Sequence, residues 1–224
     1  MIRNSVALAH LSWALPASSL MLAMLVHGLD EPRAVPFFIS EADAPGLQGW
    51  IFSIGLTLGG FAQMAYAWRL GGELGAQRPG WWRIANGVGM VAGANAVLLA
   101  RYDMWNHLDP HVVTSMLAFG GGLAWALTAH LAMGDRGTVA GRRERRRGFF
   151  ASATAFIVMI VAFRWGGGNV DPTDLTLAEF LNEAQAGINI AAPAEYVLVA
   201  GLFLCLASFR HELRSTTQGK GPGA

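Results

Sequence analysis

The chain has 224 residues, of which 53% are apolar and only 14% are charged. Because a soluble domain carries about 25% charged residues, this composition argues against a soluble enzyme, a disordered chain or a nucleic-acid-binding protein. The net charge of +1 provides no overall attraction to polyanions, so we expect no nucleic-acid partner. A single cysteine, Cys205, excludes an intrachain disulfide framework and a multi-cysteine metal site.

Six apolar stretches reach or approach the roughly 20 residues that a helix needs to cross the hydrocarbon core of a bilayer. They cover residues 5–27, 48–69, 83–101, 110–133, 148–165 and 187–209. No strand-like alternation favours an outer-membrane barrel. We therefore predict an all-α fold, a polytopic membrane bundle of six transmembrane helices. It forms one domain over residues 1–214, and a disordered tail follows over residues 215–224.

The first apolar stretch has an alternative interpretation as a signal peptide, because Arg3 gives it a basic start and small residues follow. It runs on to Val26, which is too long for an ordinary signal peptide, and we expect a retained helix. The spacings Gly55-x-x-x-Gly59 and Gly89-x-x-x-Gly93 are typical of close helix packing, and we expect them to pack within the bundle.

Two of the connecting loops carry structural signals. The 30–47 loop contains Pro36-Phe37-Phe38-Ile39-Ser40, an apolar extended segment suited to lie on the mouth of the bundle. In the last loop, Thr176 and Glu179 have the spacing of a capping box, and the apolar residues after them recur at helical spacing. We predict a short interfacial helix near residues 174–186 that covers the outer mouth.

The charged residues are distributed unequally between the two ends of the predicted helices. With the N-terminus in the cytoplasm, 13 of the 16 basic residues face the cytoplasm, whereas Arg33, Arg101 and Arg164 lie outside. The positive-inside rule favours this orientation, with both termini cytoplasmic. The basic run 142–147 is expected to be a loop that anchors the topology, with a lipid headgroup site as the alternative. This run and the Gly- and Trp-rich composition predict a multi-pass protein of a prokaryotic plasma membrane.

Ionisable and polar side chains inside a membrane are costly, so each one suggests a functional site. Glu195 lies about eight residues into the last span, and His111 begins the fourth. The other candidates near the same side are Asn95, Arg101, Asp103 and Arg164. We expect these groups to converge on one polar pocket for a lipid headgroup or ester. Glu195 or His111 would act as a base and an arginine would bind phosphate; alternatively, an arginine or histidine neutralises Glu195 and pins the helices together.

Metal and cofactor sites have weaker support. Asp103, His107 and His111 are spaced by four, but Asp109 and Pro110 are expected to start a new helix between the histidines, with Asp109 as its N-cap. Because a fourth ligand is not evident, we expect no metal. His10 and His130, near the cytoplasmic ends of their helices, could ligate a haem, yet such residues more often pack at the interface, and we expect no cofactor.

The segment 36–40, followed by Pro45 and Ile51-Phe52-Ser53-Ile54-Gly55, resembles the opening of DRAM-type proteins (damage-regulated autophagy modulators). Ala194-Glu195-Tyr196 is similar to the entry into the last helix of this family, and His111 is similar to the residue that opens its fourth helix. The resemblance spans roughly residues 36–210. It implies six helices with both ends cytoplasmic and a role tied to membrane lipids, as in the related PGAP-type proteins of GPI-lipid remodelling and the SFK-type proteins. Autophagy itself is not implied for this chain.

The leading hypothesis is a membrane protein that binds or handles lipid through an outward-facing polar pocket. A membrane-embedded lipid hydrolase or transferase using His111 and Glu195 is one alternative. A structural subunit of a larger membrane complex, whose protein partner the sequence does not identify, is another.

Overall fold

The computed structural model describes residues 2–74, 78–168, 170–171 and 173–218, and this part of the chain is helical with no strand. The elements are α1 (Ile2–Leu29), η1 (Ile39–Asp43), α2 (Leu47–Leu74), α3 (Pro79–Leu99), α4 (Leu108–Met133), η2 (Gly134–Arg136), α5 (Val139–Gly167), α6 (Leu177–Glu183), α7 (Gln185–Ser208) and α8 (Arg210–Gln218). The prediction of an all-α chain is confirmed.

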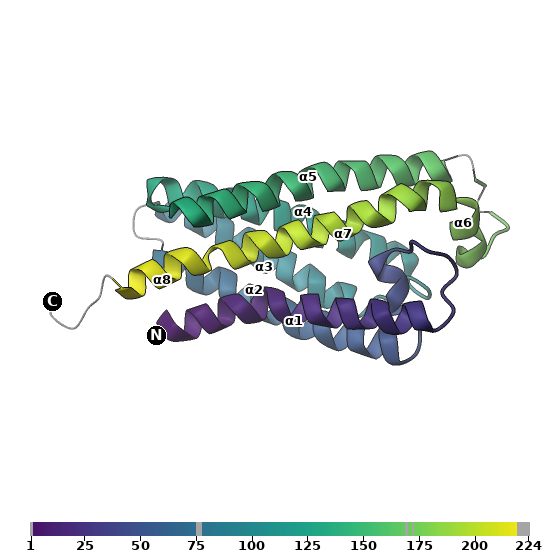
Figure 1. Cartoon of the computed structure of the whole chain (residues 1–224), viewed down its shortest axis with the longest axis horizontal. Helices are drawn as coiled ribbons and strands as arrows, with labels where there is room; N and C mark the ends of the chain where they lie inside the picture. The colour runs from purple at the N-terminus through teal and green to yellow at the C-terminus, as the bar shows by residue number, and fades with distance from the viewer. Residues whose placement is uncertain (1, 75–77, 169, 172, 219–224) are drawn as a thin grey trace.

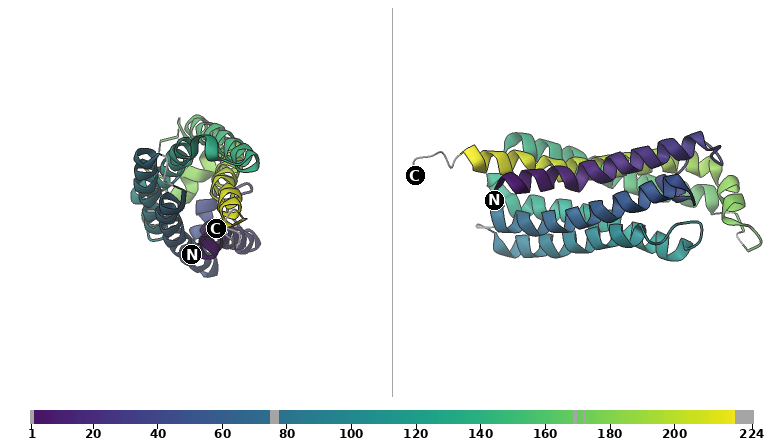
Figure 2. Two further views of the ribbon diagram at one scale, coloured as in Figure 1. Left: turned by 90° about the vertical axis from the view of Figure 1, so that its left-hand side faces the viewer. Right: turned by 90° about the horizontal axis from the view of Figure 1, so that it is seen from below.

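The long helices run side by side along one axis. In chain order α1, α2, α3 and α4 each pack on the next, whereas α5 packs mainly on α7, and α7 also contacts α1. Figure 2 (left) shows these helices end-on, arranged around a common axis. The 3-10 helix η1, the turn 100–107 and α6 lie at one end, here called the acidic end. The opposite end carries η2, the start of α5 and α8, and is called the basic end (Figure 1).

Four helical segments are long and apolar enough to cross a membrane: Ser5–Leu29, Leu108–Arg136, Val139–Gly167 and Gln185–Ser215. They correspond to α1, α4, α5 and α7, the last extended into α8. The helices α2 and α3 have 28 and 21 residues but fall outside this group. Four of the six predicted spans therefore have the length and composition of membrane helices.

Small residues let the helices approach one another closely. A Cβ atom added to Gly148 of α5 would lie 2.5 Å from the carbonyl oxygen of Gly201 in α7, so only glycine fits there. Gly59 packs on Pro16 of α1, and Gly93 packs on Met64 of α2. The expectation that the small-residue spacings of α2 and α3 serve packing within the bundle is confirmed.

The start of α5 corrects the sequence analysis. The basic run 142–147, expected as a loop, belongs to α5, which begins at Val139 rather than near residue 148. Thr138 caps this helix by accepting a hydrogen bond from the Gly141 amide at 3.1 Å. Because the run is helical, its side chains point in different directions, and one of them, Arg145, turns into the bundle.

Arg145 and the helix α8 form a buried contact at the basic end. The Arg145 guanidinium donates to Glu212 at 2.8 Å, and both side chains are only 2% exposed. The ring of Phe209 lies 4.4 Å from the guanidinium carbon, close enough for a cation–π interaction. The expected disordered tail is therefore wrong for its first part, because α8 continues to Gln218; residues 219–224 lie outside the described part.

At the acidic end, the predicted short helix is confirmed as α6. Its N-cap Thr176 accepts from the Glu179 amide, and Glu179 in turn accepts from the Thr176 amide at 2.8 Å, as the capping box predicts. The helix lies across the end of the bundle (Figure 1). By contrast, α4 begins two residues earlier than expected, at Leu108, with His107 rather than Asp109 at the N-cap position.

Candidate functional site

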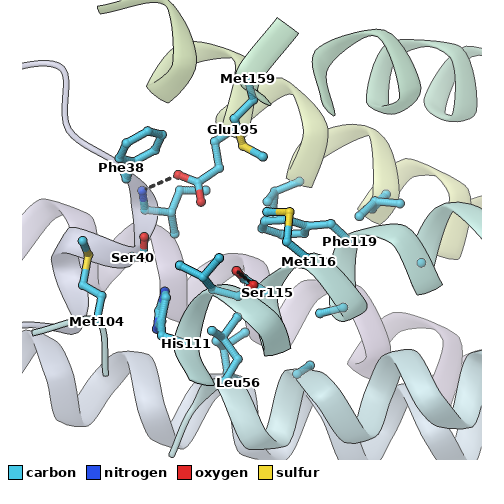
Figure 3. Close-up of a pocket in the computed structure, with 18 of the residues that line it drawn as sticks. Phe38, Ser40, Leu56, Met104, His111, Ser115, Met116, Phe119, Met159 and Glu195 are labelled. Atoms are coloured by element: carbon cyan, nitrogen blue, oxygen red, sulfur yellow. Dashed lines mark hydrogen bonds between the residues drawn. The ribbon is translucent and has the colours of Figure 1, made fainter. Parts of the chain in front are cut away.

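A cavity of about 430 Å³ lies among the helices, toward the acidic end. This volume falls within the range of about 300–1,000 Å³ that is typical of small-molecule sites. Its lining is mainly apolar, with Phe119 and Trp125 among the larger side chains. The polar exceptions include Glu195 of α7 and His111 of α4, which project into the same space (Figure 3).

The two carboxylate oxygens of Glu195 have different surroundings. One oxygen accepts a hydrogen bond from the backbone amide of Ile39 at 2.7 Å. The other makes no hydrogen bond to a described residue. The side chain is 6% exposed and lines the cavity. The alternative that an arginine or histidine neutralises Glu195 is therefore wrong within the described chain, since a backbone amide of the 36–40 segment takes that place.

His111 is held in one orientation by the turn that precedes α4. Its Nδ1 lies 2.6 Å from the carbonyl oxygen of Tyr102. A carbonyl oxygen only accepts, so Nδ1 carries the proton and Nε2 is the nitrogen available to a ligand. Nε2 has no hydrogen-bond partner among the described residues, and the side chain is 4% exposed. His111 and Glu195 therefore each present one free polar atom to a mainly apolar cavity.

The segment 36–40 closes the cavity at the acidic end, and α7 holds its backbone in place. Gln185 donates to the carbonyl of Pro36 at 3.1 Å, and the Tyr196 hydroxyl donates to the carbonyl of Phe37. Phe37 is itself buried, as are the next two residues of the segment. The apolar segment expected to lie on the mouth of the bundle is thus inserted into it.

Glu41, which the sequence analysis did not single out, fixes the other side of this segment. Its carboxylate accepts from the Phe38 amide at 2.9 Å and from Arg33 at 3.2 Å through both of its oxygens. Glu41 is fully buried, and the indole of Trp105 donates to its carbonyl oxygen at 3.4 Å. Glu41 stands at the third position of η1, where a capping box has its glutamate, but Phe38 at the N-cap has no side-chain acceptor, so the sequence carries only half of that signal.

Arg33 joins the segment to the helices that cover it. Besides Glu41, it donates to Asn182 of α6 at 2.9 Å and to Gln185 of α7 at 2.8 Å. From the sequence alone, Arg33 was expected only as one of the basic residues outside the cytoplasm. The structure shows that it connects the 30–46 loop, α6 and α7 at the acidic end.

The other predicted site residues are divided by the structure. Arg164 lines the cavity together with Glu195 and His111. Asn95 and Arg101 do not line it: Asn95 donates to the Val91 carbonyl of its own helix at 2.8 Å, and Arg101 is exposed. The structure therefore brings three residues of the predicted set into one cavity.

Asp103 also lies away from the cavity. It caps the turn before α4, where it accepts from the Asn106 amide at 2.7 Å and faces His107 at 3.3 Å. Burial raises the pKa of Asp103 somewhat, but hydrogen bonds from Asn106 and His107 outweigh it and hold that pKa below its ordinary value. His111 turns instead to Tyr102, so the three residues spaced by four do not gather. No three potential metal ligands come together among the described residues.

Asp43 is a further buried acid at the acidic end. Asp43 ends η1, is 4% exposed, and faces Ser53 at 3.4 Å. Burial, together with the negative charge of Asp103, raises the pKa of Asp43 to about 7. Nothing in the sequence distinguishes this residue from the other acids of the 30–46 loop, because its burial depends on how the loop folds back.

No protein-family model, curated protein or solved structure matches the chain. Its function has to be inferred from its own residues and their geometry.

Proposed function

We propose that the protein is an integral membrane protein that crosses the bilayer six times and binds a membrane lipid in the cavity between its helices. In this proposal α2 and α3 cross alongside α1, α4, α5 and α7. The basic end faces the cytoplasm, and the acidic end faces the outside. The observation that carries the proposal is the apolar cavity with two buried polar side chains, Glu195 and His111, each presenting one unpaired atom to it.

The exposed surface of α2 supports its crossing. Its exposed large apolar residues fall on one stripe, namely Leu47, Trp50, Ile54, Leu58, Phe61 and Trp68. Eighteen residues separate the two tryptophans, which is about 27 Å at about 1.5 Å per residue. This is close to the hydrocarbon thickness of about 30 Å, and tryptophan is enriched at both membrane surfaces. On α3, Trp81, Ile84, Val91 and Leu98 are likewise exposed.

The distribution of charge supports the orientation. The basic run of α5 and the arginines of α8 lie at one end of the bundle, and the acids of η1, of the turn 100–107 and of α6 lie at the other. Basic residues concentrate on the cytoplasmic side of membrane proteins. A plasma membrane is the compartment that this orientation suits, because the acidic end then faces the exterior.

A lipid is the ligand class that suits the cavity best. Membrane lipids combine long apolar chains with esters or hydroxyls, and this cavity combines a long apolar lining with a carboxylate and an imidazole. A hydroxyl could donate to Glu195, and an ester carbonyl could accept from either group when that group carries a proton. A strongly polar solute would leave most of the lining without a matching contact.

Native mass spectrometry of the protein, extracted from its own membrane into mild detergent, tests the proposal. We expect a lipid adduct on the wild type and its loss in Ala118→Phe, which fills the cavity from α4. Ala124→Phe, at an exposed position of the same helix, should retain the adduct. A wild type without lipid, or equal adducts in both variants, would contradict the proposal.

A second candidate is a lipid hydrolase or transferase, favoured by the projection of His111 and Glu195 into one cavity (Figure 3). His111 Nε2 would act as the base and Glu195 as the acid. In that case Glu195→Gln and His111→Ala should each abolish turnover of phospholipid vesicles while the thermal unfolding temperature stays near that of the wild type. Turnover that persists in both variants would exclude this candidate.

We also propose membership of the DRAM-type family. The two segments that carry the resemblance contact one another. The Ile39 amide donates a hydrogen bond to Glu195, and the Tyr196 hydroxyl donates one to the Phe37 carbonyl. This contact gives both segments a common structural role in closing the cavity.

A further inference from the structure

We infer that the cavity is filled from the side, through an opening between α4 and α5. We further infer that its occupant is a phospholipid whose phosphate binds Arg164 while an acyl chain enters the cavity. This inference rests on the proposed function, because it specifies the route and the class of the lipid.

The exposure of the lining residues locates the opening. Most residues that line the cavity are buried or half-buried. The four that are exposed all belong to α4 and α5: Leu108 at 41%, Val112 at 46% and Ile160 at 40%, together with Arg164. A residue that both lines a cavity and reaches the surface marks a place where the two are connected. These four residues are called the portal below.

The spacing of the portal residues shows that they form two facing edges. Leu108 and Val112 are four residues apart on α4, and Ile160 and Arg164 are four residues apart on α5, so each pair lies on one helix face. Both pairs lie in the half of the helix nearest the acidic end, at the start of α4 and the end of α5.

The packing of the bundle explains why a portal can exist at this position. α4 packs chiefly on α3, and α5 packs chiefly on α7, whereas α4 and α5 touch one another only lightly despite being consecutive in the chain. Their short connection through η2 lies at the basic end, away from the portal. An apolar chain could therefore pass between them from the bilayer without separating a well-packed helix pair.

Arg164 defines the class of headgroup. It lies at the edge of the portal and makes no ion pair with a described residue. The next residue, Trp165, is 65% exposed, as expected for an aromatic side chain at the membrane surface. A guanidinium at the membrane surface lies at the level of the phospholipid phosphates, and it can bind a phosphate through two hydrogen bonds.

The position of the portal determines which side chains an entering acyl chain would contact. A chain that enters past Ile160 and Val112 meets Phe119 and, deeper, Trp125, both apolar contacts. Glu195 and His111 lie on the cavity wall near the acidic end, where the ester region of such a lipid would be (Figure 3). The phosphate stays outside at the membrane surface, so no uncompensated charge enters the apolar cavity.

Photo-crosslinking in lipid nanodiscs tests the route. The probe is phosphatidylglycerol with a diazirine in one acyl chain, and the readout is the label on the peptide containing Phe119, quantified by mass spectrometry. We expect Val112→Trp and Ile160→Trp, singly and together, to lose most of this label. The matched controls Val113→Trp and Val161→Trp replace exposed neighbours on the same two helices that do not line the cavity, and they should retain it.

Competition tests the headgroup. Unlabelled phosphatidylglycerol should displace the probe from the wild type better than diacylglycerol with the same chains. In Arg164→Gln this preference should fall by roughly tenfold, the effect of losing a charge-assisted hydrogen bond. Arg101→Gln, an exposed arginine at the same end that does not line the cavity, should keep the preference.

Three results would overturn parts of this account and can be told apart. Normal labelling of Phe119 in the portal variants would exclude entry between α4 and α5, and an unchanged preference in Arg164→Gln would exclude the phosphate contact. Either result leaves lipid binding itself intact. An unlabelled Phe119 peptide in the wild type would exclude both the portal and the proposed lipid site.

Discussion

Glu195 illustrates how one side chain can combine a structural and a chemical role. One carboxylate oxygen accepts a hydrogen bond from the Ile39 amide and so holds the segment that closes the cavity. The other oxygen faces the cavity. A glutamine at this position keeps an acceptor for the Ile39 amide but can no longer release or receive a proton. A leucine removes both properties.

We therefore expect Glu195→Gln to unfold within a few degrees of the wild type and Glu195→Leu to unfold several degrees lower. Leaving the buried Ile39 amide unpaired costs about 1–3 kcal/mol, and about 1 kcal/mol corresponds to about 2–4 °C in a domain of this size. A thiol-reactive dye that labels the buried Cys205 on unfolding provides the measurement. Equal unfolding temperatures for the leucine variant and the wild type would show that the bond to Ile39 does not stabilise the fold.

Asp43 predicts a pH dependence of stability. Its pKa is about 7 in the folded protein, against an ordinary value of 3.8. The folded state therefore holds this proton more tightly than the unfolded chain does. The stabilisation is complete below about pH 4 and is lost as the pH rises to about 7. Above pH 7 the folded state carries a buried, charged Asp43.

Relative to the wild type, Asp43→Asn should thus gain unfolding temperature between pH 5 and pH 8, by several degrees. The comparison uses the difference between the two proteins at each pH, which cancels the titration of other groups. Asp174→Asn, an exposed acid in the last loop of the acidic end, serves as the control and should show no such trend. A difference between Asp43→Asn and the wild type that is constant with pH would contradict the assignment.

At the scale of the elements, a buried ion pair joins α8 to α5. Arg145 and Glu212 are joined at 2.8 Å, and the Thr138 amide also donates to Glu212 at 3.1 Å. Removing one partner of a buried pair leaves the other charge without compensation, at a cost of about 3–5 kcal/mol, whereas removing both is often much less harmful.

Accordingly, Arg145→Met and Glu212→Leu should each lower the unfolding temperature strongly, and the double variant should recover part of the loss. Circular dichroism measures the unfolding, and hydrogen exchange of residues 210–218 should rise in both single variants. Arg143→Met is the matched control, because Arg143 belongs to the same basic run but is not buried. Strictly additive effects in the double variant would mean that the two residues do not stabilise α8 as a pair.

The elements also show what sequence patterns can and cannot provide. The long helices and α6 were predictable because apolar runs and a capping box are local signals. The burial of Arg145 was not, because its partner Glu212 lies 67 residues away and only the folded bundle brings them together. Likewise, a basic run is usually a solvated face, and its local sequence does not reveal the residue that turns inward.

The candidate site was predictable to a smaller degree. Glu195 and His111 were found because ionisable groups are rare within apolar runs. Asn95, Arg101 and Asp103 were assigned to the site because they lie at a similar depth, but depth alone does not determine which way a side chain points. Glu41 and Arg33 were missed because they lie in a loop, where charge is ordinary, and their burial follows from its insertion into the bundle.

The whole molecule combines a polar, tightly connected acidic end with a looser contact between α4 and α5. The segment 36–40 and α6 close the cavity along the bundle axis (Figure 1). Arg33 connects them by donating to Asn182 of α6 and to Glu41, which accepts from the Phe38 amide. The exposed lining residues indicate that the cavity is connected to the surface at the portal. In the proposed function, this arrangement would admit a lipid from the bilayer while the segment 36–40 and α6 close the end of the bundle.

The most direct test of lipid binding in the cavity is a crystal structure of the protein grown with phosphatidylglycerol whose acyl chains carry bromine. We predict a bromine anomalous peak inside the cavity, between Phe119 and Trp125, in addition to any peaks on the outer surface of the bundle. Bromine found only on the outer surface, with the cavity empty, would contradict the account.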